Sequence, residues 1–141
     1  MPMAHIQPDS RRFILVIDDN ISDRSLYCAW LEQSLEGNAI IMAADSLQEA
    51  KTTLESCRPD CIILDHQLLD GTGMDYLKYL TEYYGNMPPI VVFISGIAEE
   101  DLGKRAVSNG AVTFIPKNKL NPNLLHLAVR RILQDGEVAS I

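Results

Sequence analysis

The feature that most constrains the fold is a regular alternation of short apolar runs with amphipathic, helix-like stretches. The runs are apolar at consecutive positions, which is typical of strands buried on both faces of a parallel sheet. They occupy five places in the chain: Phe13–Ile17, Ala39–Ala43, Cys61–Leu64, Ile90–Ile94 and Val112–Ile115.

The stretches between the runs carry helix signals. Residues 47–57 repeat apolar side chains at helical spacing, and Ser46 with Glu49 forms the S-x-x-E pattern of a capping box. The last stretch has Asn121 as the expected N-cap and Pro122 at the first helical position. Strands that alternate with helices predict an α/β fold, a doubly wound (βα)5 unit with helices on both faces of one five-stranded parallel sheet.

Length and charge narrow the class of protein. A chain of 141 residues predicts one domain, which we place at residues 12–134 between a flexible lead (1–11) and a short tail (135–141). The formal net charge of −7 argues against direct nucleic-acid binding, which needs a basic face. No apolar stretch approaches the ~20 residues that span a bilayer, and the polar, proline-broken beginning is unlike a signal peptide, so we expect a cytoplasmic protein.

Polar residues stand where the apolar runs end. The first run ends in Asp18-Asp19, the third in Asp65, the fourth in Ser95-Gly96, and the fifth near Lys117. The carboxyl ends of parallel strands meet at one edge of the sheet, where ligands bind in folds of this kind. We therefore expect three carboxylates, a hydroxyl and an ammonium group to converge at this edge.

Three neighbouring carboxylates need compensating positive charge. Each close pair costs about 4 kcal/mol at an effective dielectric constant near 20. Lys117 supplies one positive charge, and a divalent cation would supply two more. Mg²⁺ prefers oxygen ligands and retains several waters, so it can also hold a phosphoryl oxygen. The pattern predicts phosphoryl chemistry, with one carboxylate as the nucleophile and Ser95 as a hydrogen-bond donor.

Four stretches carry a resemblance to the receiver domain of two-component response regulators. They are ILVIDDN (14–20), CIILDHQLLDGTGMDYL (61–77), IVVFISG (90–96) and AVTFIPK (111–117). The resemblance covers residues 12–134, and it lies in the ordered set of motifs rather than in any one of them. It implies a flavodoxin-like fold with strand order 2-1-3-4-5.

The resemblance also implies a role for each acidic residue. Asp65 would be the phosphoacceptor in a two-component phosphorelay. Asp19 would bind Mg²⁺ directly, and Asp18 would help through a metal-bound water. The backbone carbonyl of Gln67 would complete the protein ligands, beside Asp65 itself.

The remaining motif residues would sense the phosphoryl group. Ser95 would hydrogen-bond one phosphoryl oxygen, and Lys117 would pair with another. Ser95 and Phe114 would form the switch, with Phe114 at the family's aromatic position. Phe114 lacks the hydroxyl of a tyrosine, so a ring movement would form no new hydrogen bond there.

One position departs from the family pattern. Receiver domains usually carry a proline after the lysine, joined by a cis peptide bond, whereas Asn118 follows Lys117 here. A cis bond without proline costs about 3 kcal/mol or more. Either this bond is strained or the loop takes another path, and the exact placement of Lys117 depends on which holds.

The resemblance implies partners rather than an enzymatic output. The phosphoryl donor would be a sensor histidine kinase or a phosphotransfer protein. The signal would pass to a downstream protein or a linked output domain, or to a second copy in a homodimer through the fourth helix, fifth strand and fifth helix. The chain would then act alone through protein contacts or be a fragment of a longer protein.

Three other functions remain to be weighed. A Mg²⁺-dependent aspartyl-phosphate phosphatase would need Asp-x-Asp after the first strand, where Asn20 replaces the second aspartate. Flavin binding would need a Ser/Thr/Gly-rich loop there, but DDNISD is acidic. A phosphorylation-silent interaction scaffold would not need the complete acidic set.

Overall fold

The computed structural model describes residues 11–96 and 101–139, and these fold around one five-stranded parallel sheet. Its strand order is β2-β1-β3-β6-β7, which in order of appearance is the predicted 2-1-3-4-5 arrangement. The flavodoxin-like α/β fold is therefore confirmed. The strands are β1 (Arg12–Ile17), β2 (Ala39–Ala44), β3 (Cys61–Asp65), β6 (Ile90–Ser95) and β7 (Thr113–Pro116).

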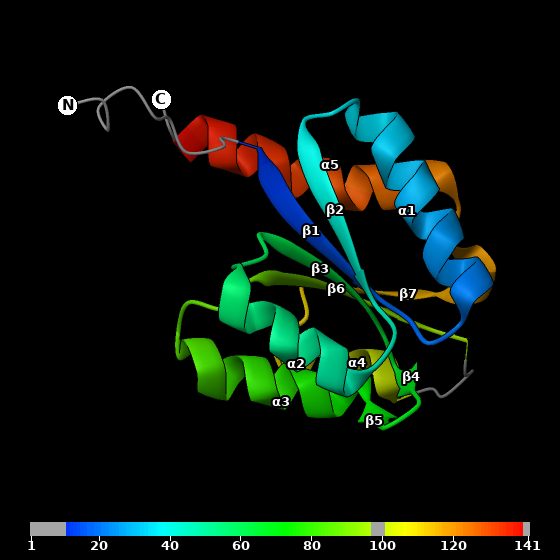
Figure 1. Ribbon diagram of the computed structural model, residues 1–141, viewed down its shortest axis with the longest axis vertical. Coiled ribbons are helices and arrows are strands. Elements are labelled where there is room, and N and C mark those ends of the chain that lie inside the picture. Colours follow the sequence, from blue (N-terminus) through cyan, green and yellow to red (C-terminus); the bar gives the residue numbers. More distant parts are fainter. Residues whose placement is uncertain (1–10, 97–100, 140–141) are drawn as a thin grey trace.

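Helices cover both faces of the sheet (Figure 1). One apolar core joins the sheet to α2, α3 and α4, and a second joins it to α1 and α5. The central strand β3 is buried along its whole length, as its unbroken apolar run predicts. The helices are α1 (Ile21–Leu35), α2 (Leu47–Ser56), α3 (Gly73–Tyr84), α4 (Leu102–Ser108) and α5 (Pro122–Ala139).

The structure shifts the predicted strand ends by one residue in places, most clearly in the last strand, and it lengthens the last helix. The last strand begins and ends one residue later than expected, because Val112 is exposed and Pro116 still pairs with Ser95. Proline is tolerated there since β7 is an edge strand. Helix α5 continues to Ala139, past the predicted domain end at residue 134. Residues 1–10 of the predicted N-terminal lead lie outside the described residues. The limits of the domain stay a prediction.

A small hairpin follows the central strand and was not predicted. Its strands, β4 (Gln67–Leu68) and β5 (Gly71–Thr72), are too short to show a period of two. At its turn, the Asp70 carboxylate accepts hydrogen bonds from the backbone N–H groups of Leu47 and Gln48, at 2.7 and 2.9 Å. These two hydrogen bonds lower the pKa of Asp70 and tie the hairpin to the N-terminus of α2.

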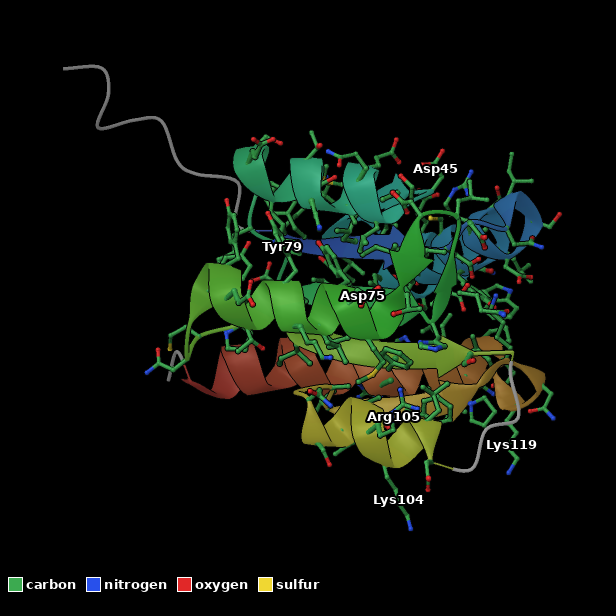
Figure 2. The ribbon with its side chains drawn as sticks, turned by 90° about the horizontal axis from the view of Figure 1, so that it is seen from below. Asp45, Asp75, Tyr79, Lys104, Arg105 and Lys119 are labelled. Atoms are coloured by element: carbon green, nitrogen blue, oxygen red, sulfur yellow. The ribbon has the colours of Figure 1, made fainter. Side chains whose placement is uncertain are left out.

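The helix caps agree largely with the sequence. Ser46 accepts from the Glu49 backbone N–H, but the Glu49 carboxylate accepts from Asp45 rather than from Ser46, so only half of the predicted capping box forms. The Asn121 cap is confirmed, with its side chain accepting from the Leu124 backbone N–H. A complete box at Thr72 and Asp75 begins α3, and Figure 2 shows Asp75 at the hairpin end of this helix.

Strand register brings the strand ends together. Ile17 lies opposite Leu64, so Asp18 follows directly beside Asp65. On the other side of β3, Asp65 lies opposite Ile94, and Ser95 is the next residue along β6. Within residues 11–96 and 101–139, no helix combines the length and the apolar character that crossing a membrane requires.

Candidate functional site

Three aspartates converge at the carboxyl edge of the sheet. Carboxylate oxygens of Asp18, Asp19 and Asp65 lie within 4.8 Å of one another. Asp18 and Asp65 are almost fully buried, with 0% and 2% exposure, while Asp19 is half-buried. The predicted convergence of the three carboxylates is thus present in the structure.

Hydrogen bonds fix Asp18 at the end of β1. One of its carboxylate oxygens accepts from the Asn20 backbone N–H at 2.9 Å. Its backbone carbonyl accepts from the Arg24 guanidinium at 2.8 Å. The Asn20 side chain in turn accepts from the Asp23 backbone N–H and caps α1. The carboxylate of Asp18 is therefore held where β1 passes into α1.

Lys117 reaches into the same cluster from the end of β7. Its ammonium lies 2.9 Å from the other carboxylate oxygen of Asp18 and 3.6 Å from Asp65. Its shortest contact, 2.8 Å, is with Asp23 in the first turn of α1. Burial lowers the pKa of Lys117, but the hydrogen bond to Asp23 and the nearby carboxylates of Asp18 and Asp65 outweigh it and raise the pKa above its ordinary value.

Sequence reasoning missed Asp23. The available signal was its position four residues after Asp19, at the start of a helix that begins at the site. A side chain in the first turn of that helix lies close to the strand end that precedes it, so the position offered Asp23 as a neighbour of the acidic cluster.

The loop after Lys117 takes the alternative path considered from the sequence. No cis peptide bond occurs in residues 11–96 and 101–139. Residues Lys117–Lys119 form instead a single 3₁₀ turn, which closes with a hydrogen bond from the Leu120 backbone N–H to the Lys117 carbonyl. Lys117 still reaches Asp18 and Asp65, so the missing proline does not remove it from the site.

The hairpin folds back onto Asp65. The Gly73 backbone N–H donates to the His66 carbonyl at 2.7 Å. A Cβ atom at Gly73 would lie 2.7 Å from the Asp65 carbonyl oxygen, which no side chain can occupy without moving the backbone. Gln67 stands exposed in β4, and its carbonyl as a metal ligand stays a prediction.

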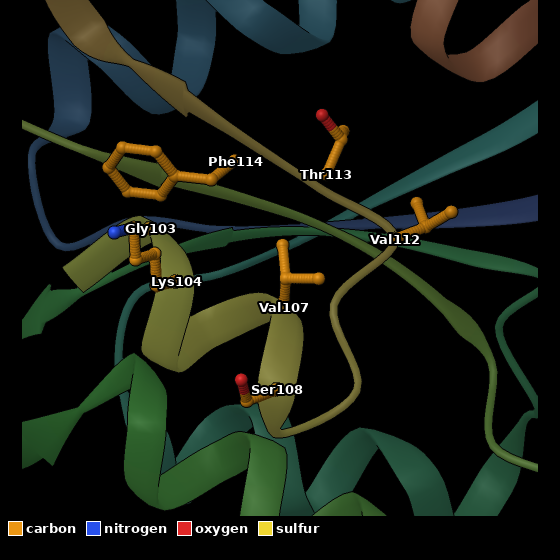
Figure 3. Close-up of a pocket in the computed structure, with 7 residues that line it drawn as sticks. All are labelled: Gly103, Lys104, Val107, Ser108, Val112, Thr113 and Phe114. Atoms are coloured by element: carbon orange, nitrogen blue, oxygen red, sulfur yellow. The ribbon is translucent and has the colours of Figure 1, made fainter. Parts of the chain in front are cut away.

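The two predicted switch residues lie on neighbouring strands. Ser95 is buried at the end of β6, and Phe114 is half-buried on β7. The Phe114 ring covers Gly103 of α4, where a Cβ atom would lie 2.9 Å from the ring. Figure 3 shows this ring beside an open pocket of about 630 Å³ between α4 and β7.

The cluster carries more negative charge than Lys117 offsets. The pKa of Asp65 is raised to about 7, first by burial and then by the charge of Asp18, with Lys117 acting in the opposite direction. All three carboxylates offer the hard oxygen ligands that Mg²⁺ prefers. The residues present therefore fit a divalent cation, which would relieve this repulsion.

The fold and the site together define a class of protein: a doubly wound α/β protein with an acidic site at the carboxyl ends of its strands. Residues 14–130 match the sequence pattern of the response regulator receiver domain. The chain belongs to this family, whose members are the receiver domains of two-component signalling.

Individual relatives agree with this assignment. Over 110 residues the chain is 38% identical to protein-glutamate methylesterase/protein-glutamine glutaminase 2 of Shewanella oneidensis, covering 77% of the chain and 30% of that protein. The chain thus spans about a third of such curated relatives.

Solved structures of receiver domains agree in fold. The signal receiver domain of a DNA-binding response regulator from Colwellia psychrerythraea superposes with a TM-score of 0.80 at 24% identity, covering 87% of this chain and 98% of that one. The beryllofluoride-activated NtrC4 receiver domain dimer gives 0.76 at 25% identity, covering 87% and 97%.

The raised pKa of Asp65 predicts a pH-dependent stability in the absence of divalent metal. A carboxyl group whose pKa is raised on folding binds more protons in the folded state between about pH 4 and 7, so stability falls as pH rises through this window. We expect D65N to be more stable than the parent at pH 8. Its advantage should shrink below pH 7, with a slope of at most about 1.4 kcal/mol per pH unit.

The measurement is chemical denaturation in EDTA from pH 5 to 8. The difference between D65N and parent isolates Asp65 from the other titrating groups. An advantage of D65N that is the same at pH 5 and pH 8 would contradict the assignment.

Proposed function

We propose that this receiver domain accepts a phosphoryl group on Asp65 in a Mg²⁺-dependent reaction. The observation that carries the proposal is the buried Asp65 carboxylate, which lies beside the fixed Asp18 and 3.6 Å from the ammonium of Lys117, at the edge where the family has its chemistry. Asp65 is the central member of this group, because β3 lies between β1 and β6.

The reaction follows from the groups present. A carboxylate oxygen of Asp65 forms a bond to phosphorus, while the bond from phosphorus to the donor's leaving atom breaks and its electron pair leaves with the donor. The Lys117 ammonium is placed to stabilise negative charge on the transferring group. The Ser95 hydroxyl stands one strand away as a hydrogen-bond donor to a phosphoryl oxygen.

Asp19 and Asp65 would hold Mg²⁺ directly, with Asp18 acting through a bound water and Gln67 contributing its carbonyl. The metal would supply charge neutralisation at the phosphoryl oxygens. Asp19 suits direct ligation, since it is the half-buried member of the three and none of the contacts described above involves its carboxylate.

The phosphoryl donor we propose is a sensor histidine kinase or phosphotransfer protein in the cytoplasm, and the domain is a signalling element rather than an enzyme acting on other substrates. The phosphatase alternative is disfavoured by Asn20, whose side chain caps α1 instead of standing as a second acid. A phosphorylation-silent scaffold remains the main alternative and is separated by the labelling experiment below.

The output surface we propose consists of α4, β7 and α5. A phosphoryl group on Asp65 would attract the Ser95 hydroxyl. Ser95 ends β6, which pairs with β7, the strand that carries Phe114, so a movement of Ser95 would affect the surroundings of the Phe114 ring. Because the Phe114 ring lies against Gly103, its movement would alter the packing of α4. Val107 and Val112 are exposed on this surface and would meet a partner or a second copy.

The first test is phosphorylation itself. With acetyl phosphate and Mg²⁺, we expect the intact mass of the parent to increase by one phosphoryl group, because Asp65 offers a nucleophilic oxygen beside Lys117. D65N should show no increase, whereas D45N, which changes an exposed aspartate outside the cluster, should be labelled like the parent. Labelling of D65N equal to that of the parent would mean that another residue is the acceptor.

The second test concerns the metal. Mg²⁺ should raise the melting temperature of the parent, because it binds the folded acidic cluster and not the unfolded chain. D19N should lose most of this shift and be at least as stable as the parent in EDTA, since one repulsive charge is gone. The control is D45N, which changes an exposed aspartate outside the cluster and should keep the full Mg²⁺ shift of the melting temperature. A full Mg²⁺ shift in D19N would rule out Asp19 as a ligand.

The third test concerns the output surface. Sedimentation with beryllofluoride and Mg²⁺ should show self-association of the parent, as the NtrC4 receiver relative forms a dimer in its activated state. V107D should weaken it, because the substitution places a charge on the exposed surface of α4. M87D changes an exposed residue before β6 and serves as the matched control. Equal association of both variants would exclude this surface.

A further inference from the structure

Asp23 gives this site an acidic residue beyond the set that the family resemblance implies. Its carboxylate lies 2.8 Å from the Lys117 ammonium, closer than Asp18 at 2.9 Å and Asp65 at 3.6 Å. The Asp23 side chain is 35% exposed, whereas that of Asp18 is fully buried. Asp23 is thus the most solvent-accessible of the three carboxylates around Lys117.

This contact reduces what Lys117 can offer to a phosphoryl group. An ammonium group has three N–H donors. One of them donates to Asp23 at 2.8 Å, and the ammonium also lies within ion-pair distance of Asp18 and Asp65, so less of it is available to a group bound to Asp65. The negative charge of Asp23 also offsets the ammonium charge at short range, where a bound or incoming anion would otherwise feel it in full.

We propose that Asp23 is a positioning residue that competes with a phosphoryl group on Asp65 for the charge of Lys117, and so limits how readily the site accepts that group. This inference rests on the proposed function of Asp65. Asp23, in the first turn of α1, would slow phosphorylation by acting on Lys117, without contacting the phosphoryl group itself.

The decisive variant is D23N. The amide oxygen can still accept a hydrogen bond from the ammonium group, so the position of Lys117 is preserved while the negative charge is removed. We expect the initial rate of labelling by acetyl phosphate to rise by roughly 3- to 10-fold at low salt, because an anionic donor meets less repulsion and a stronger cation. The increase should diminish in high salt, since exposed charges are screened.

Two control variants separate this effect from others. D23E restores the charge and should label within about twofold of the parent, on the same Coulomb argument. E55Q removes one negative charge from the exposed end of α2, and its rate should match the parent. All rates are compared at Mg²⁺ concentrations that saturate each protein in a melting titration, so that altered metal affinity does not enter. A D23N rate equal to or below the parent rate overturns the proposal.

A measurement without phosphorylation separates the proposed role of Asp23 from the proposed phosphorylation of Asp65. In EDTA, melting temperatures of the parent, D23N, K117M and the double variant form a double-mutant cycle. The change caused by D23N should be more negative when Lys117 is present than when methionine replaces it, because only then is an ion pair lost. If the two changes are additive, Asp23 and Lys117 are not coupled and the inference fails. If the parent itself takes no label while the cycle shows coupling, the proposed function fails and the ion pair stands.

Discussion

The arrangement of the site depends on the burial of Asp18 and Asp65 side by side, with Lys117 close enough to both to offset part of their charge. The strand register places the two aspartates side by side, because Ile17 lies opposite Leu64 and each aspartate is the next residue of its chain segment. Isolated buried charges are costly, and pairing with an opposite charge offsets part of that cost. The lysine comes from the far edge strand, so the ion pairs connect β1, β3 and β7 across the sheet.

The same edge is closed from the side of the hairpin. Gly73 contacts the backbone of Asp65, and Asp70 binds the first N–H groups of α2, so β4 and β5 link the acidic cluster to two helices. On the opposite side, Phe114 contacts Gly103 where a side chain would not fit. Each link uses either a glycine or a backbone hydrogen bond, so a shift at one of these contacts affects the element packed against it.

The sequence predicted the parallel sheet and the converging side chains because both follow from strong periodic signals, whereas the strand order was implied by the resemblance to receiver domains. Unbroken apolar runs identify buried parallel strands, and polar residues at their ends must meet at one edge. The hairpin was missed because strands of two residues carry no period. Asp23 was missed because its role depends on a contact between α1 and the end of β7, which are 94 residues apart in the chain.

The 3₁₀ turn at Lys117–Lys119 bears on how such chains are recognised. A lysine followed by asparagine is delivered to the acidic cluster by this turn without proline at the next position. A sequence search that required lysine and proline as a pair would reject this chain, although its lysine meets Asp18 and Asp65 in space. The informative pattern is the lysine together with the aspartates it reaches, and inventories of receiver domains built on the dipeptide will undercount proteins with this turn.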